Sequence, residues 1–170
     1  MTINSKLKTI GSTEYVSIAG IKGVPAKVDT GADSSSIWAS NINMTEDGVL
    51  EFVLFDKKSP LYTGECLRFK DYRAKAIRSS YGDEQIRYRV KLPLTIGDET
   101  YETTFTLANR SRNNFPILIG RRTLKGHFLV DVSRRVVERE SNTRRTPKLN
   151  RELTSDPYRF HQKYIKERSE

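Results

Sequence analysis

The chain has 170 residues, within the usual range for one domain and too short for two large lobes. Lys and Arg number 30 against 21 Asp and Glu, and the net charge of +9 suits either acidic partners, such as nucleic acid, a ribosomal surface or an acidic peptide, or a basic surface with no such partner. A single cysteine excludes an intramolecular disulfide framework, and no apolar run is long enough to span a membrane. We therefore expect a soluble, cytoplasmic protein.

Short strands joined by glycine-bearing turns are predicted for the first half of the chain. Residues 14–20 and 21–28 form a hairpin that leads directly into Asp29. The apolar runs at 36–42 and 49–55 are strands by their length and by the turn residues that bound them. Residues 1–13 are polar with little periodicity, and the segment 66–78 is less regular.

Alternating apolar and polar residues predict a long hairpin over residues 86–108, with its turn at Gly97-Asp98. One face of its first strand is basic, and Pro93 on that polar face favours an edge strand or a bulge. A short buried strand, 115–120, then ends in Gly120. After this strand we predict one or two helical turns over 121–126 and then a last strand over 127–132.

The composition changes beyond Ser133, which divides the chain into residues 1–140 and a basic tail, 141–170. Residues 141–155 are rich in Arg, Thr and Asn, which is typical of a mobile linker. Asp156-Pro157 has the form of an N-cap and first helical position, so we predict a short amphipathic helix over 157–168. The tail is either solvated or an RNA-contacting arm, and the lack of an aromatic stacking pattern favours the first.

The stretch 26–37 brings a carboxylate, Asp29, to a Thr-Gly bend at the end of a strand. An Asp before a Gly commonly just makes a turn, with its side chain accepting hydrogen bonds from nearby backbone N–H groups. A strand end is also where catalytic carboxylates are often held. The later segment Ile117-Leu118-Ile119-Gly120-Arg121 bears on this choice.

Together, Asp29-Thr30-Gly31-Ala32-Asp33 and Ile117–Arg121 resemble the paired motifs of retropepsin-type aspartic proteases. With Arg78-Ser79-Ser80 and Phe128–Asp131, the chain more closely resembles a bacterial family formerly described as ATP-dependent zinc proteases, found beside ATP-grasp glutamate ligases that act on ribosomal protein tails. The resemblance covers about residues 10–135. It implies an all-β, retropepsin-like closed barrel of a single lobe, with one short helix and a C-terminal helical tail.

The resemblance also implies site residues. Asp29, Thr30 and Gly31 would be catalytic: Thr30 would bond its counterpart across a two-fold axis, and Gly31 would let a peptide backbone approach. The substrate-binding residues would be Ala32, Asp33, Arg121, Ile119 and, at the tip of a closing hairpin, Ser79 and Ser80. The Asp33–Arg121 pair could equally be a salt bridge that only stabilises the fold, and residues 79–83 an ordinary surface loop.

Aspartic protease chemistry needs two adjacent carboxylates that share a proton, one to activate water and one to polarise the scissile carbonyl. The chain has a single Asp-Thr-Gly and no Asp-Ser-Gly. A dyad can therefore form only in a homodimer in which each chain contributes Asp29. This predicts an aspartic endopeptidase that acts on peptide or protein substrates.

The sequence lacks the residue patterns that metal-dependent or ATP-dependent chemistry would need. The histidines are His127 and His161, no His-Glu-x-x-His occurs, and Cys66 stands alone, so we expect no metal site and a buried, inert thiol. No phosphate-binding Gly-x-x-x-x-Gly-Lys loop is present, so we expect no ATP and no other cofactor.

Two alternatives to the protease stay open. One is a non-cleaving module of the same fold that binds acidic or ribosomal-protein tails, for which the basic face of Arg87, Arg89 and Lys91 is suited. The other is an RNA-associated protein led by its basic tail, whose RNA binding would depend steeply on salt.

Overall fold

A computed structural model describes residues 7–78, 84–138 and 145–165. The chain divides into two compact units, residues 1–137 and 138–170, which are described separately here. The strands of the first unit are β1 (Lys8–Gly11), β2 (Thr13–Ile18), β3 (Ile21–Val28), β4 (Ser35–Met44), β5 (Leu50–Leu54), β6 (Cys66–Phe69), β7 (Arg73–Arg78), β8 (Glu84–Ile96), β9 (Glu99–Ala108), β10 (Ile117–Ile119) and β11 (Phe128–Asp131). One short helix, α1 (Arg121–Leu124), separates β10 from β11.

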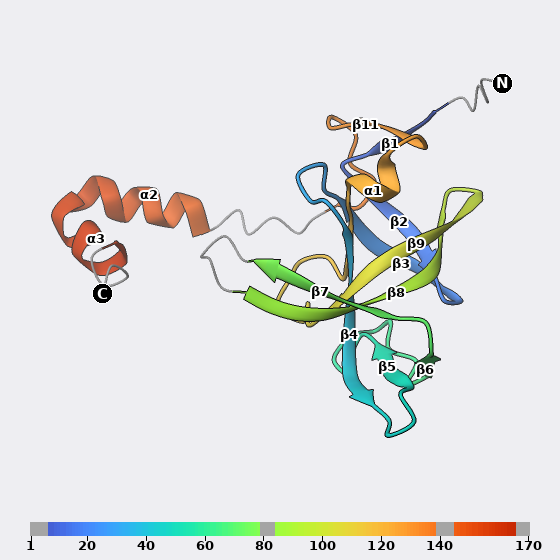
Figure 1. Ribbon diagram of the computed structural model, residues 1–170. Coiled ribbons are helices and arrows are strands. Elements are labelled where there is room, and N and C mark those ends of the chain that lie inside the picture. The colour runs from blue at the N-terminus through green and yellow to red at the C-terminus, as the bar shows by residue number, and fades with distance from the viewer. Residues whose placement is uncertain (1–6, 79–83, 139–144, 166–170) are drawn as a thin grey trace. The chain divides into compact units, whose positions relative to one another are not determined.

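Six strands close into a barrel in the order β10-β3-β2-β8-β9-β4. The ring closes because β10 pairs with β3 in parallel on one side and with β4 antiparallel on the other. β5 and β6 extend the sheet from β4, and β1 and β11 form a separate parallel pair. Figure 1 shows that pair beside α1 at one end of the barrel and β5 and β6 at the other. The predicted all-β retropepsin-like barrel with one short helix is confirmed.

Alternating apolar side chains fill the barrel interior. The fully buried side chains include Ile18, Val24, Ile37, Leu94, Phe105 and Ile117, from six different strands. Residues two apart on a strand point to the same face, so this alternation leaves the polar residues of β8 on the outside. Packing of the core therefore decides which side chains of β8 and β9 are exposed on the outer surface of the barrel.

Both predicted hairpins are present. The β2–β3 turn has Ala19 and Gly20 at φ 47° and 81°, the left-handed conformation that a tight hairpin turn requires. Pro93 lies within β8, between the stretch that pairs with β7 (84–89) and the stretch that pairs with β2 (94–96). On its other side Pro93 pairs with Glu102 of β9, so the proline stands where one side of β8 has no partner among the described strands, a position in which proline is tolerated.

Strands β1, β6 and β7 were not predicted from the sequence. β1 pairs with β11, more than a hundred residues away, and β6 and β7 pair with β5 and β8. Each is short, at four to six residues, and β6 and β7 contain no buried residue. Their partners, rather than their own sequences, therefore stabilise them.

The second unit contains α2 (Arg145–Ser155) and α3 (Pro157–Tyr164), so the prediction of a mobile linker over 141–155 is wrong for the residues described. The Glu152 carboxylate on α2 accepts hydrogen bonds from the Tyr164 hydroxyl (2.8 Å) and the Lys163 ammonium (3.2 Å) on α3. These contacts join the two helices, and residue composition did not reveal them.

The predicted start of the C-terminal helix is confirmed, since the Asp156 side chain accepts from the Arg159 N–H at 2.9 Å and Pro157 follows directly. The helix ends at Tyr164, earlier than predicted. Among the described residues, no helix is both long and apolar enough to cross a lipid bilayer.

Candidate active site

The Asp29 loop follows β3 and is held by the strand beside it. β10 runs parallel to β3 with Ile119 opposite Val28, and the Asp29 N–H donates to the Ile119 carbonyl at 2.9 Å. The N–H groups of Gly31 and Ala32 donate to Oδ1 of Asp29 at 3.1 and 3.2 Å. The Ile-Leu-Ile-Gly strand thus passes directly beside the Asp-Thr-Gly turn.

Gly120 lets the two motifs meet. A Cβ at this position would lie 2.6 Å from the backbone carbonyl carbon of Ser34, closer than real Cβ contacts occur. Its N–H donates to the Ser35 hydroxyl (3.0 Å), and the next N–H, of Arg121, donates to the Ala32 carbonyl (2.8 Å). The first turn of α1 is thus hydrogen-bonded to the loop that carries Asp29.

Three cations surround the Asp33 carboxylate. Arg122 lies at 3.1 Å, Lys75 at 3.3 Å and Arg121 at 4.0 Å. Hydrogen bonds from Arg122 and, second, from Lys75 hold the pKa of Asp33 below its usual value. The expected partner, Arg121, is therefore the most distant of the three, because the backbone at the start of α1 brings the next residue's guanidinium closer.

Lys75 was not predicted as a site residue. It lies on β7, and its ammonium also donates to the Ser34 hydroxyl at 2.9 Å. It thereby connects the β7–β8 hairpin to the loop after Asp29. No local pattern marks this lysine, because its partners lie about forty residues earlier in the chain.

A cleft of about 790 Å³ lies between the Asp29 loop and β7. Asp29, Gly31 and Ala32 line it from the loop, and Ala76 and Ile77 line it from β7. The lining also contains four cations, which are Lys75, Arg78, Arg87 and Arg110. The only carboxylates among its described lining residues are Asp29 and Asp33, so the cleft is predominantly basic.

Arg110 is half-buried in this cleft, and its Nε donates to the Phe115 carbonyl at 3.0 Å. Burial lowers the pKa of Arg110 below its usual value, and Arg87 acts in the same direction, whereas Asp29 favours the charged form. An arginine stays protonated at neutral pH even so. Arg110 is thus a partly desolvated positive charge within electrostatic reach of Asp29.

A sequence model of the RimB-like family, described as retropepsin-like aspartic endopeptidase RimB, matches residues 9–141. The chain belongs to this family. The match spans both the Asp29 loop and the Ile117–Arg121 segment, so it covers the whole of the loop geometry described above. The recognition made from the sequence motifs is confirmed.

Curated relatives of this RimB-like chain carry the name probable alpha-L-glutamate ligase. Those of Desulfotalea psychrophila and Shewanella pealeana are each 31% identical over 130 residues, and that of Parasynechococcus marenigrum is 30% identical over 129 residues. The matches cover 72–73% of this chain and 27–28% of the relatives, so the chain spans about a quarter of their length. The names agree with the predicted association of the family with glutamate ligases.

A crystal structure of a Legionella pneumophila protein with unknown function is similar in fold. The TM-score is 0.57 at 26% sequence identity, over 75% of this chain and 95% of that chain.

The predicted site residues of the RimB-like chain take three kinds of position. Gly31, Ala32 and Asp33 line the cleft with Asp29, while Thr30, Asp33 and Arg121 line a second hollow between α1 and β11. Ile119 is fully buried in the core, so its side chain supports the loop from below instead of facing the cleft. Ser79 and Ser80 lie outside the described residues, between the ends of β7 and β8.

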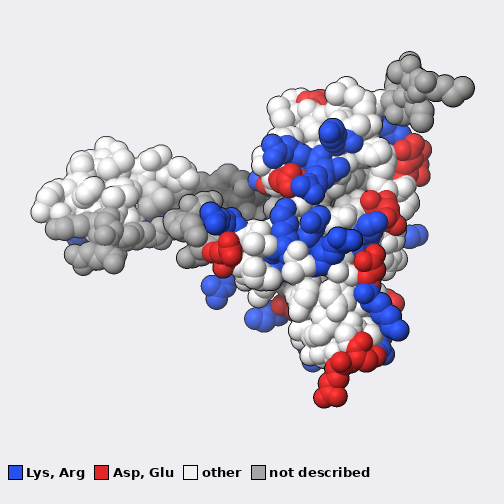
Figure 2. Space-filling model, viewed as in Figure 1, with Lys and Arg blue, Asp and Glu red and all other residues white. Residues whose placement is uncertain are grey.

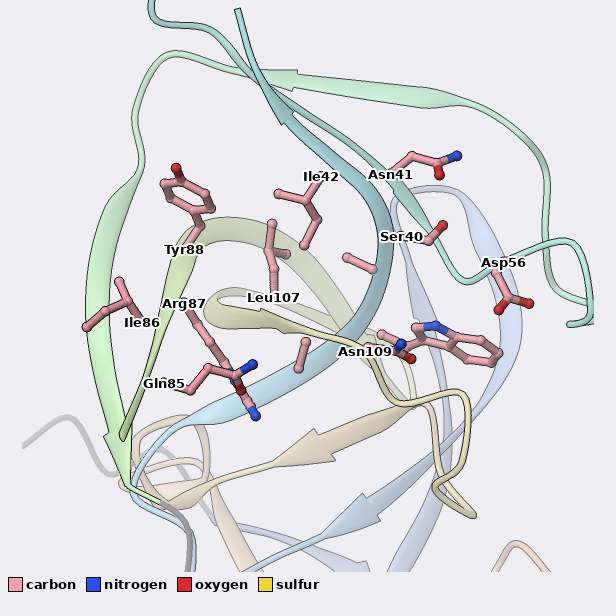
Figure 3. Close-up of a pocket in the computed structure, with 13 residues that line it drawn as sticks. Ser40, Asn41, Ile42, Asp56, Gln85, Ile86, Arg87, Tyr88, Leu107 and Asn109 are labelled. Atoms are coloured by element: carbon pink, nitrogen blue, oxygen red, sulfur yellow. The ribbon is translucent and has the colours of Figure 1, made fainter. Parts of the chain in front are cut away.

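A further hollow of about 490 Å³ lies between β4, β8 and the end of β9. Figure 3 shows Ile42, Leu107 and Tyr88 around it and Arg87 beside Gln85, whose side-chain oxygen accepts from Arg87 Nε at 2.8 Å. None of the residues of the Asp29 loop lines this hollow. Arg87 lines both it and the cleft.

Metal-ligating side chains do not cluster in the part of the chain described, where no three His, Cys, Asp or Glu residues could hold an ion together. Cys66 is exposed on β6, so the prediction that it is buried is wrong. Its strand lies at the edge of the sheet, paired only with β5 among the described strands, which leaves its side chain in contact with solvent.

Proposed function

We propose that this RimB-like chain is one half of a homodimeric aspartic endopeptidase that hydrolyses peptide bonds with one Asp29 from each chain. The observation that carries the proposal is the position of the Asp29 carboxylate, fixed by two backbone N–H groups and open to the basic cleft. A carboxylate so held keeps its orientation without a side-chain partner, which leaves its second oxygen free for water or for a second carboxylate.

The reaction follows from a pair of Asp29 carboxylates that share one proton. The ionised carboxylate accepts a proton from water, and the protonated one donates a hydrogen bond to the scissile carbonyl oxygen. Water oxygen then bonds to the carbonyl carbon as the C=O π bond opens, and the carbonyl oxygen takes the proton of the second carboxyl. On collapse the C=O bond re-forms and the C–N bond breaks. The amine nitrogen takes the proton that the first carboxylate accepted from water, and a diol hydroxyl returns a proton to the second carboxylate, which restores the shared-proton pair.

Dimerisation is supported by the hollow between α1 and β11. It has a volume of about 720 Å³ and is lined by Thr30, Leu124 and Phe128 together with Leu129, which is 54% exposed. An exposed leucine beside Thr30 suits a self-complementary contact that brings two Asp29 loops together about a two-fold axis.

Acidic substrates are supported by the charge of the cleft. Lys75 is already paired with Asp33, whereas Arg87 and Arg110 line the cleft with no ion pair to a described carboxylate. Guanidinium groups bind carboxylates strongly, so glutamate-rich peptides, including ribosomal-protein tails, are the substrate class we propose. The exposed thiol of Cys66 supports a reducing, cytoplasmic setting.

The names of the curated relatives favour a second candidate function. Because the chain matches about a quarter of proteins called probable alpha-L-glutamate ligase, a related domain accompanies a ligase there. The second candidate is accordingly a module that binds acidic tails in its basic cleft without cutting them.

The test compares Asp29→Asn with the unaltered protein on glutamate-rich peptides, with products identified by mass spectrometry. Loss of the ionisable carboxylate should lower hydrolysis by about 10²- to 10⁴-fold, the range for removing a general base. Asp56→Asn, which removes a carboxylate outside the cleft, is the matched control. Equal hydrolysis by Asp29→Asn and the unaltered chain would refute the protease, and binding without any hydrolysis would favour the module.

A further inference from the structure

A row of basic residues continues out of the cleft along the outer face of β7 and β8. Arg73 lies directly opposite Arg89, and Lys75 directly opposite Arg87. Lys91 follows two residues after Arg89 on the same face of β8, opposite Thr104 of β9. We call these five residues, Arg73, Lys75, Arg87, Arg89 and Lys91, the basic track, and Figure 2 shows Lys and Arg gathered on this face.

The basic track is unfavourable for the fold. Like charges directly opposite each other on paired strands are destabilising, and the track contains two such pairs. Lys75 is compensated by Asp33 and Lys91 by Glu102, at 3.0 Å. No described Asp or Glu forms an ion pair with Arg73, Arg87 or Arg89, and Nε of Arg89 is buried without a hydrogen-bond partner. A buried donor without a partner calls for an acceptor, which water or an anion can supply.

The outer half of the track forms a pocket of its own, about 290 Å³ in volume. Arg73, Arg89 and Lys91 line it together with the Thr104 side chain. Asp71 is the one carboxylate among its described lining residues, so cations exceed carboxylates there. None of the Asp29-loop residues lines this pocket, and β7 and β8 connect it to the cleft.

We propose that Arg73, Arg89 and Lys91 form an exosite for acidic side chains of the same polypeptide whose scissile bond lies at Asp29. This inference rests on the proposed function for the placement of the scissile bond. Alternate residues of a strand lie about 7 Å apart, and alternate side chains of an extended peptide have the same spacing. From Arg87 to Lys91 the track is about 13 Å long, which corresponds to about four substrate residues.

An acidic peptide fits the exosite better than a nucleic acid does. Single-stranded nucleic acids are bound by basic grooves that also offer aromatic faces for base stacking. The aromatic residue of the pocket, Tyr72, packs edge-on against Tyr88 at 5.9 Å, and its hydroxyl donates to the Gly48 carbonyl at 2.9 Å. Its ring is therefore engaged in packing, and guanidinium groups remain as the main binding elements.

The experiment measures binding separately from cleavage. Full-length Asp29→Asn protein is titrated into fluorescein-labelled oligoglutamates of about four and about ten residues, and dissociation constants are obtained from fluorescence anisotropy. The shorter peptide fills the cleft, and the longer one also reaches the exosite. Adding Arg73→Gln and Arg89→Gln should weaken binding of the longer peptide about five- to tenfold, as for the loss of two partly exposed charge contacts, and leave the shorter one unchanged.

Lys57→Gln with Lys58→Gln is the matched control, since it removes the same charge from the exposed loop after β5. The exosite variant should also melt at the same or a higher temperature than its parent, because it relieves repulsion between β7 and β8. A lower melting temperature would assign the two arginines a structural role and overturn the exosite.

Three further results would contradict the proposal. Equal losses in the exosite and control variants would show only a general charge effect, and equal losses for both peptide lengths would place the arginines in the cleft. Tighter binding of a uridine oligonucleotide of similar length, lost in the exosite variant, would reassign the track to nucleic acid. Failure of the protease proposal is distinct: hydrolysis would be absent while the length-dependent binding persisted.

Discussion

Gly31 and Gly120 are both glycines of the Asp29 site, and they are glycines for different physical reasons. A Cβ at Gly120 would meet backbone atoms of Ser34 and Ala32 at 2.6 to 3.0 Å, so the fold itself excludes a side chain there. A Cβ at Gly31 would meet only the Asp29 carboxylate, at 3.4 Å, which is an ordinary contact. Its exposed surface instead lines the cleft in which we place the substrate.

Alanine substitutions at these two glycines should therefore separate stability from activity. Gly120→Ala should lower the free energy of unfolding by about 1–3 kcal/mol, as overpacking against backbone does. Gly31→Ala should unfold at the same urea concentration as the unaltered protein. It should hydrolyse peptides more slowly, because the added methyl group occupies space needed by the substrate backbone. Urea titration and a peptide cleavage assay measure the two effects, and equal stability of both variants would contradict the packing argument.

Contacts of Asp33 connect the β7–β8 hairpin and helix α1 to the loop that follows Asp29. The Asp33 carboxylate accepts hydrogen bonds from Arg122 of α1 and from Lys75 of β7, and these two hydrogen bonds lower its pKa. A depressed pKa means that the folded chain holds a proton at this carboxyl less readily than the unfolded chain does. The resulting stability is present above the ordinary pKa of 3.8 and is lost as the pH falls through the lower folded value.

Asp33→Asn should unfold at a lower urea concentration than the unaltered protein at neutral pH. The difference should vanish as the pH falls below 3.8 and through the depressed pKa, because both side chains are then uncharged. Glu102→Gln, which breaks the exposed pair with Lys91, is the matched control and should change stability little at any pH. A difference between Asp33→Asn and the unaltered protein that grew in acid would contradict the assigned direction.

For the whole molecule, the decisive property is that one chain carries half of the proposed dyad. Among the described residues, the buried apolar side chains lie between Ile10 and Val137, so a single chain supplies the barrel core seen here. Association would then join preformed barrels, and the exposed side chain of Leu129 beside Thr30 is available for it. Activity should depend on protein concentration as the dimer dissociates.

Leu129→Asp should abolish dimerisation and hydrolysis together while leaving the urea unfolding transition of the barrel in place, because this side chain is half exposed. Sedimentation velocity measures the association, and the cleavage assay is run on the same samples. Ile42→Asp, at an exposed position on β4, is the control and should stay dimeric and active. A monomeric Leu129→Asp that retained full activity would refute the shared dyad.

The sequence by itself determined the barrel hairpins and the two motifs around Asp29. Alternation of apolar residues and glycine-bearing turns are local signals, so residues 14–28 and 86–108 were predictable. The Asp-Thr-Gly and Ile-Leu-Ile-Gly segments were recognisable because together they resemble the paired motifs of retropepsin-type aspartic proteases, and the structure shows that their close approach requires glycine at position 120.

Only the tertiary structure decided which charges meet. The closer pairing of Asp33 with Arg122 than with Arg121, the contact from Lys75 and the register that sets Arg73 opposite Arg89 all depend on strands and turns distant in sequence. The pairing of β1 with β11 and the α2–α3 contacts through Glu152 are non-local in the same way. Side-chain type and spacing along a chain carry no information about such partners, because long-range pairing is set by how the elements pack.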